Sequence, residues 1–355
     1  MADIADLYKG TGISKDQLSD DGEPCILYGE LYTKYKSETI KEVISKTNID
    51  NTKLVRSKAN DVIIPCSGET AEDIATARCV LNDNILLGGD LNIIRLHGYD
   101  GTFMSYQLNG KRKYDIAKVA QGVSVVHLYG EHLKGVKTIN PCLEEQKKIA
   151  SLLALLDERI ATQNKIIDKL QSLIKGIAQH SIRELVKGYG YVRLGDICKI
   201  TTGKLDANAQ VENGQYPFFT CAELPFNIDS YAFDTEALLI SGNGANLGYI
   251  NYYKGKFNAY QRTYVLDHFT VNIQYVKWAL KVLLPKRIAI EKSSSNTPYI
   301  VLSTIANLQL PIPSKSKQSY ISSLMLSFER KLSNQLALSD LYNKQKQYML
   351  RQMFI

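Results

Sequence analysis

The sequence is dominated by two long stretches in which apolar residues recur with heptad spacing. In the first, residues 141–185, proline occurs only at Pro141 and glycine only at Gly176. An apolar period of 3.5 residues held over this length is typical of a coiled-coil seam rather than of a helix inside one compact core. At 1.5 Å per residue the predicted helix is on the order of 65 Å long. Its a positions are Leu153, Ile160, Ile167 and Ile174, and its d positions are Ile149, Leu156, Gln163, Leu170 and Ile177.

A second copy of this stretch closes the chain, displaced by 172 residues, so that Gln146 falls on Gln318 and the polar d residue Gln163 falls on Gln335. Antiparallel pairing about the two midpoints would bring both d glutamines into adjacent layers. A single buried polar layer fixes the register of a coiled coil. We therefore expect Gln163 and Gln335 to lie close together. The second seam weakens near its end; its a positions are Met325, Leu332, Ser339 and Lys346, and its d positions are Ile321, Phe328, Gln335, Tyr342 and Met349.

The segments that precede the two helices also resemble each other, which indicates an internal duplication. The matches pair Asp3-Ile4 with Asp196-Ile197, Gly10 with Gly203, Ser67-Gly68 with Ser241-Gly242, and Leu128 with Leu302. The predicted order is a globular region at 1–140, a helix at 141–185, a second globular region at 186–312 and a second helix at 313–355. The two globular regions agree only at framework positions. A scaffold kept twice with different loops predicts two related surfaces that recognise different things.

Local patterns indicate that both globular regions are rich in β-strands. Strand composition with glycine punctuation occurs at 61–68, 79–89 and 91–98, and again at 236–244, 247–255 and 259–267. A helix is predicted over 271–288 and a short amphipathic helix over 37–48. The fold class is therefore α+β, with two β-rich domains separated by two long helices that form an antiparallel coiled coil.

The sequence carries no motif that supports catalysis by this chain alone. The glycines of residues 241–248 have the wrong spacing for a dinucleotide-binding loop, and the sequence lacks a phosphate-binding P-loop. Residues 140–143 lack the second proline and the aromatic ring of an amino-methyltransferase motif. The five histidines show no metal-ligand spacing, and the six cysteines form no C-x-x-C pair. Scattered free thiols, no signal peptide and no apolar run approaching about 20 residues predict a cytoplasmic protein without membrane spans.

Specific residues then point to a known family. Residues 141–160 contain the pattern P-x-x-E-E-Q-K-K-I-A followed by L-L-D-E-R-I, and an L-x₄-L-x₂-V pattern occurs at Leu128, Leu133 and Val136. With the duplicated domain starts, these motifs resemble the DNA-specificity subunit of type I restriction–modification systems over essentially the whole chain. The second helix departs from the pattern, because Ser316-Lys317 replaces the two glutamates. The first domain has only two residues before Asp3, which leaves open whether a lead-in segment is missing.

This resemblance implies a division of labour among subunits. Each globular region would be a target recognition domain that reads one half of a bipartite, asymmetric site in double-stranded DNA, and the helices would set the spacer. Two methylation subunits would dock on the chain and transfer methyl groups from S-adenosylmethionine to adenine N6. Whether two motor/nuclease subunits, which use ATP and Mg, also join is left open. The resemblance implies that the specificity subunit itself has no catalytic residue, metal or cofactor.

Candidate contacts to bases or phosphates lie in the divergent loops, where amide side chains can pair with adenine and arginine with guanine. They are Lys9, Lys15, Thr70, Arg95, Lys111 and Arg112 in the first domain, and Thr202, Lys204, Asn243, Asn246, Gln261 and Arg262 in the second. The net charge of +7 is modest for a DNA-binding protein. An alternative hypothesis is therefore a coiled-coil scaffold with two β-rich protein-binding domains and no role in nucleic-acid binding.

Overall fold

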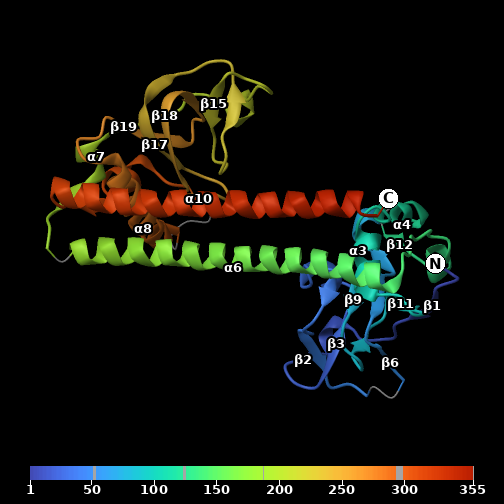
Figure 1. Ribbon diagram of the computed structural model, residues 1–355. Helices are drawn as coiled ribbons and strands as arrows, with labels where there is room; N and C mark the ends of the chain where they lie inside the picture. The colour runs from blue at the N-terminus through green and yellow to red at the C-terminus, as the bar shows by residue number, and fades with distance from the viewer. Residues whose placement is uncertain (51–52, 123–124, 187, 293–298, 355) are drawn as a thin grey trace. The chain divides into compact units, whose positions relative to one another are not determined.

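The chain packs into two compact units that share both long helices. A computed structural model describes residues 1–354 except 51–52, 123–124, 187 and 293–298. Unit 1 comprises Met1–Lys165 and Leu336–Ile355, and unit 2 comprises Ile166–Gln335. The helices α6 (Leu143–Val186) and α10 (Lys315–Gln352) are the two longest elements in Figure 1, and each gives part of its length to each unit. Division by packing thus differs from the sequential division into 1–140, 141–185, 186–312 and 313–355.

Two five-stranded sheets form the β-rich part of unit 1. The first has the order β1-β11-β7-β9-β4, and its central strand β7 is buried along its whole length. The second has the order β2-β5-β3-β10-β6. The first sheet consists of β1 (Ala5–Lys9), β11 (Leu91–Leu96), β7 (Asp61–Pro65), β9 (Arg78–Val80) and β4 (Thr39–Ile40). The second consists of β2 (Leu18–Ser19), β5 (Ser45–Thr47), β3 (Glu23–Ile26), β10 (Leu86–Leu87) and β6 (Val55–Arg56).

Short helices connect and cover these sheets. The strands β8 (Ser67–Gly68) and β12 (Val126–His127) form a separate pair. The aromatic residues Phe103 and Tyr106 of α3 are buried against both long helices, in one cluster with Leu153 of α6 and Leu350 of α10. The helical elements are η1 (Lys15–Gln17), α1 (Glu30–Thr33), α2 (Ala71–Ile74), α3 (Gly101–Asn109), α4 (Lys113–Val119) and α5 (Gly130–Lys134).

Unit 2 is built around one six-stranded sheet with the order β14-β19-β17-β18-β15-β16. These strands are β14 (Lys199–Thr202), β19 (Thr263–Asp267), β17 (Phe233–Ser241), β18 (Ile250–Ala259), β15 (Tyr216–Phe219) and β16 (Phe226–Ile228). A second, two-stranded sheet pairs β13 (Tyr191–Arg193) with β20 (Gln309–Pro311). The helical elements are α7 (Leu194–Ile197), η2 (Ala207–Ala209), α8 (Ile273–Lys292) and α9 (Leu302–Ala306). The predicted helix at 271–288 and all six predicted strand regions are confirmed.

The predicted heptad positions face the interior, and the α+β class is confirmed. On α6, Leu153 is fully buried and Gln163 is 5% exposed. Within unit 1 the two helices run antiparallel, because Asp157 of α6 contacts Lys346 of α10 at 2.6 Å, whereas Asn164 contacts Ser339 at 3.0 Å. The polar residues at the weak end of the second seam thus have polar partners. Gln163 belongs to unit 1 and Gln335 to unit 2, and their pairing stays a prediction.

The repeated glutamine that follows each helix-entry proline has a structural role. In unit 1 the Gln146 side chain accepts a hydrogen bond from the backbone N–H of Asp100 (2.9 Å) and donates one to the carbonyl of Pro141 (2.7 Å). In unit 2 Gln318 does the same with Asn272 (3.0 Å) and Pro313 (2.8 Å). Asp100 and Asn272 are the N-caps of α3 and α8. Each glutamine therefore ties the start of a long helix to the start of a domain helix.

The matched glycines Gly10 and Gly203 are required by a close approach of two backbone segments. The N–H of Gly10 donates to Leu91 (2.9 Å), and that of Gly203 donates to Thr263 (3.3 Å). A Cβ atom at Gly203 would lie 1.8 Å from the carbonyl oxygen of Ala259, and one at Gly10 would meet a carbonyl oxygen at 2.1 Å. The two positions are thus equivalent, as the sequence predicts.

Backbone pairing corrects the predicted alignment of Ser67-Gly68 with Ser241-Gly242. Pro65 pairs with Leu91, whereas Ser241 pairs with Thr263. Pro65 is thus the counterpart of Ser241, and the sequence match with Ser67-Gly68 is wrong by two residues. Two similar dipeptides happened to occur near the ends of equivalent strands.

The same correction applies to the segment that precedes each long helix. The N–H of Leu128 donates to Cys66 (2.8 Å), and that of Ile300 donates to Gly242 (2.8 Å). Leu128 is therefore equivalent to Ile300 rather than to Leu302. With this shift, the helices α5 and α9 correspond residue for residue.

The predicted helix over 37–48 is wrong. This segment contains β4 and β5, and β4 pairs in parallel with Cys79 and Val80 of β9. Ile40 and Thr47 are each 1% exposed. Hydrogen bonding and burial within the sheets thus outweigh the local helical pattern. Among the described residues, no helix is both long and apolar enough to cross a membrane.

Candidate nucleic-acid interface

Four loops come together in unit 2 at the ends of its strands. We call this set, residues 203–206, 220–222, 242–246 and 260–262, the second rim. The N–H of Gln261 donates to the carbonyl of Leu205 (2.9 Å), and its side-chain Nε2 donates to Asp206 Oδ1 (2.8 Å). The N–H of Tyr260 donates to the carbonyl of Phe219 at 2.9 Å. These contacts hold three of the four loops together.

The fourth loop is joined to the others through Cys221. Its Sγ donates to Asn243 Oδ1 at 2.9 Å and approaches the carbonyl of Arg262 at 3.7 Å. Asn246 Nδ2 donates to the carbonyl of Cys221 at 3.1 Å. The two asparagines therefore use part of their hydrogen-bonding capacity within the rim, whereas the side chain of Arg262 is exposed.

All six candidates of the second domain lie in or next to this rim. Thr202 is the last residue of β14, and Lys204 is two residues further on. Both are exposed. The structure thus brings together Thr202, Lys204, Asn243, Asn246, Gln261 and Arg262, which the sequence placed in three separate loops.

Unit 1 carries the equivalent set of loops. We call residues 10–12, 27–30, 66–67 and 88–90 the first rim. The N–H of Gly88 donates to the carbonyl of Ile26 (2.9 Å), and the N–H of Cys66 donates to the carbonyl of Asp90 (2.7 Å). The carboxylate of Asp90 accepts a hydrogen bond from Ser67 Oγ at 3.3 Å. Each backbone contact has a counterpart in the second rim.

A recess of about 880 Å³ opens beside the first rim. Ile13 and Leu27 give it an apolar lining, and Lys15, Lys34 and Asp90 contribute charged groups. One wall is the helix α1, which lies in the part of unit 1 that is longer than its counterpart in unit 2. The longer part of unit 1 thus contributes one wall of the recess.

The candidates of the first domain are scattered. Lys9 and Lys15 are exposed and border the first rim. Thr70 caps α2, since its hydroxyl accepts from the N–H of Asp73 at 3.0 Å. Arg95 makes a bidentate ion pair, at 2.9 and 2.7 Å, with the buried carboxylate of Asp61. Thr70 and Arg95 thus have local structural partners.

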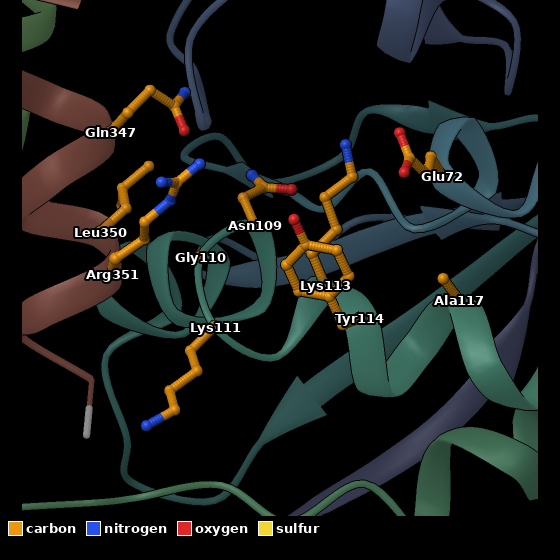
Figure 2. A pocket seen from close by; sticks show the side chains of 10 residues that line it. All are labelled: Glu72, Asn109, Gly110, Lys111, Lys113, Tyr114, Ala117, Gln347, Leu350 and Arg351. Carbon is orange, nitrogen blue, oxygen red and sulfur yellow. The ribbon is translucent and has the colours of Figure 1, made fainter. Parts of the chain in front are cut away.

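Lys111 and Arg112 lie in a different place, at the turn between α3 and α4. Lys111 lines a groove of about 350 Å³ between this turn and the C-terminal part of α10. Figure 2 shows that Lys111 points away from the side chains of Asn109 and Lys113, which line the same groove. Arg112 pairs with Asp115 at 3.1 Å. The structure does not bring these two basic residues to the first rim.

The cysteines and acidic groups do not form an obvious reactive centre. Burial raises the pKa of the Cys25 and Cys66 thiols to about 11, and that of Cys79 and Cys198 to about 12. Such thiols stay protonated near neutral pH and are poor nucleophiles. Within the part of the chain that the structure describes, no group of three His, Cys, Asp or Glu side chains is placed to hold a metal ion.

The sequence interpretation missed Asp90 and Cys221 as members of the two rims. Asp90 sits in a Gly-Gly-Asp turn with φ of +58°, and its place becomes clear only when this turn is aligned with residues 260–262. Cys221 was interpreted as one of several scattered thiols. A repeat alignment anchored on Leu91 and Thr263 would have found Asp90.

Comparison with known proteins identifies the class of this duplicated architecture. The chain belongs to the family described as type I restriction modification DNA specificity domain, whose sequence model matches residues 1–172 and 187–338. This match confirms the resemblance seen in the sequence motifs. The model matches the chain twice, once in each repeat, so the chain holds two copies of the family domain.

Individual relatives carry the same description. The chain is 46% identical over 130 residues to the type I restriction enzyme EcoDI specificity subunit of Escherichia coli, covering 37% of this chain but 29% of that protein. It is 26% identical over 288 residues to the MjaIX specificity subunit of Methanocaldococcus jannaschii, covering 70% of this chain and 67% of that protein. The chain thus matches less than a third of the first relative and about two thirds of the second.

Solved structures share the fold. The S subunit of a type I restriction-modification system from M. genitalium has a TM-score of 0.67 and 18% identity, covering 100% of this chain and 94% of that chain. A chain from a structure on complex assembly and conformational transition of the type I R-M system has a TM-score of 0.61 and 16% identity, covering 98% and 95%. At these identities the similarity concerns the fold.

Proposed function

We propose that this chain is the DNA-specificity subunit of a type I restriction–modification enzyme. The observation that carries the proposal is the duplication itself. The same strand framework occurs twice and ends in equivalent rims, yet the side chains of the two rims differ. Two such surfaces in one chain suit a bipartite site whose halves have different sequences.

The chain reads DNA and leaves the chemistry to its partners. Two methylation subunits dock on it and transfer methyl groups from bound S-adenosylmethionine to adenine. Where motor/nuclease subunits join the assembly, they supply ATP and Mg. No catalytic residue, metal or cofactor is assigned to this chain.

In this proposal the two long helices set the distance between the two DNA-reading domains, and DNA geometry determines that distance. Modules that read major-groove edges on one face of the duplex must be spaced by about one helical turn or a multiple of it. The helices set this spacing, and two glutamines, the buried Gln163 and the half-buried Gln335, fix the register between them. Insertion of whole helical turns into both helices should lengthen the unread spacer of the recognised site.

The test is genome-wide detection of methylated adenine in cells that carry this chain with its cognate methylation subunit, compared with cells that lack the chain. We expect a bipartite, asymmetric motif that appears only when the chain is present. A methylation pattern that is the same with and without the chain would contradict the proposal.

Salt dependence separates this function from that of a protein-binding scaffold. Phosphate contacts release counterions, so the logarithm of the DNA-binding constant of the assembled enzyme should fall linearly with the logarithm of the salt concentration. The slope should become shallower by about one when Lys204 is replaced by Gln, if it contacts one phosphate. No observation on the chain specifically favours the scaffold alternative.

A further inference from the structure

The two rims can be compared position by position, and the inference drawn from this comparison rests on the proposed function. The carbonyl of Asp90 accepts a hydrogen bond from Cys66 in the first rim (2.7 Å), and the carbonyl of Arg262 accepts one from Gly242 in the second (2.8 Å). Each residue directly precedes the strand residue that pairs with the end of the neighbouring strand. Asp90 and Arg262 therefore occupy the same place in the two copies of the scaffold, with opposite charge.

The backbone presents both side chains outward. Asp90 adopts a left-handed conformation, with φ of +58°, and is exposed, although Gly88 and Leu91 beside it are buried. Its carboxylate has about four acceptor sites, and the hydroxyl of Ser67 at 3.3 Å uses one of them. The main chain of Arg262 is held by Gly242, while its side chain is exposed. Rigid backbones with exposed polar ends are suited to reading base edges.

We propose that Asp90 and Arg262 are equivalent base-reading residues with opposite hydrogen-bonding preference. Arg262 donates two hydrogen bonds to O6 and N7 of a guanine in the major groove. Asp90 is an acceptor and requires an exocyclic amino group. Adenine presents its N7 acceptor beside the N6 amino group, which repels a carboxylate, whereas cytosine presents the N4 amino group alone. Asp90 therefore reads cytosine.

The surroundings of Asp90 offset the repulsion between its carboxylate and the DNA phosphates. Lys9 ends the strand that leads into the first rim, and Lys15 lines the same recess as Asp90. Both lysines are exposed. In this proposal their ammonium groups contact phosphates near the base pair that Asp90 reads. The recess beside the first rim, which Asp90 helps to line, gives that rim a concave surface of its own.

The experiment measures the recognised motif for single variants of the full chain with its methylation subunit. Asn tolerates a left-handed backbone and pairs with adenine N6 and N7, so Asp90→Asn should keep the fold and shift one position of one half-site from cytosine towards adenine. Arg262→Gln should weaken the preference for guanine in the other half-site. Each change in preference should be roughly 5- to 150-fold, as expected for loss of one good base contact.

Matched controls lie at the far ends of the same sheets. Asp83→Asn removes an exposed charge from the turn before β10 and keeps the acceptor for the N–H of Ala59. Lys199→Gln removes an exposed charge at the start of β14. Both should leave the motif unchanged. Selection of bound duplexes by the purified complex gives the same information for a variant that no longer supports methylation.

The possible results are distinct. A parental motif in which one or both half-sites lack a G·C pair would overturn the inference and leave the proposed function intact. Variants that keep every base preference of the parent would do the same. Changes in the same half-site for both variants would also overturn it. A parental chain that specifies no motif would overturn the proposed function, and the inference with it.

Discussion

Replacement of Lys346 by Met should destabilise unit 1 selectively. Lys346 lies near the C-terminal end of α10, and its ammonium contacts Glu38 at 2.5 Å and Asp157 at 2.6 Å. The three side chains are only 8–11% exposed. Methionine matches the length of the lysine stem but removes the ammonium that contacts both carboxylates. The variant therefore leaves two acids buried side by side without their shared partner.

The expected cost follows from the burial of this cluster. Removal of one partner from a buried ion pair costs about 3–5 kcal/mol, because the remaining charge is not compensated. That is a large part of the 5–15 kcal/mol by which a typical domain is stable. Amide exchange through global opening of unit 1 should accelerate by roughly 150- to 5,000-fold, which is the same free energy expressed as a ratio.

The loss of stability caused by Lys346→Met should depend on pH. Burial raises the pKa of Glu38, and the Lys346 ammonium opposes this rise. Without the lysine the pKa of Glu38 rises further, so the folded variant holds a proton more tightly than its unfolded chain does. Its stability therefore increases as the pH falls through the folded-state pKa. The difference from the parent should be largest at neutral and alkaline pH and should shrink under acidic conditions.

Hydrogen exchange measured by mass spectrometry can follow both units in one sample. Peptides from β7 and β11 report on unit 1, and peptides from β17 and β19 report on unit 2. The single tryptophan, Trp278, is 5% exposed and lies in unit 2, so its fluorescence during urea unfolding is an independent measure of that unit. We expect faster exchange in β7 and β11 with little change in the fluorescence midpoint.

Lys344→Met is a matched control two residues away. Lys344 pairs with Asp340 at 2.7 Å, but the two side chains are 74% and 62% exposed. Loss of such a pair on a helix surface changes stability by less than about 0.5 kcal/mol. Equal exchange rates in the Lys346→Met and Lys344→Met variants would refute the reasoning. Partial recovery in a variant that also carries Glu38→Gln would support it.

Three further outcomes are expected. Gln318→Leu loses the hydrogen bond from the N–H of Asn272 at the start of α8 and the one to the carbonyl of Pro313 before α10. It should destabilise unit 2 by about 1–3 kcal/mol, measured as a lower urea midpoint of tryptophan fluorescence, and an unchanged midpoint would contradict the capping role. Gly203→Ala places a methyl group against a backbone carbonyl and should cost about 1–3 kcal/mol in the same assay, whereas an alanine at the open position Gly188 should not. Simultaneous replacement of Gln163 and Gln335 by Leu should raise the thermal stability of the chain but allow methylation of motifs with more than one spacer length. A motif with one unchanged spacer length would argue against a role of the glutamines in fixing the register.

The helices and the repeat could be predicted because their signals are local or periodic. The heptad spacing of residues such as Leu153 and Ile174 survives in the buried face of α6, and the matched glycines Gly10 and Gly203 report a close backbone approach. Both features depend on side-chain size at fixed spacing. A periodic apolar face and a position without a Cβ atom can be recognised without knowledge of distant partners.

Features that depend on distant partners could not be predicted. Lys346 looked like a defect in the second seam, because its partner Glu38 is 308 residues away in the sequence. Arg95 was a candidate for base reading on residue type, and its partner Asp61 lies on a neighbouring strand. The incorrect helix at 37–48 has the same origin, since pairing with β9 decides its conformation. The candidates of the second domain gathered at one rim because they were chosen from turns that end adjacent strands.

The shared architecture of unit 1 has a consequence for synthesis on the ribosome. Phe354 is 1% exposed and packs edge to face on Phe103, with ring centroids 5.3 Å apart. Translation at 5–20 residues per second needs roughly 10–40 s to add the 190 residues from 166 to 355. During this interval Phe103 is not yet covered by the end of the chain, whereas unit 2 can already be complete. A translation product interrupted before α10 therefore leaves Phe103 in unit 1 without its aromatic partner.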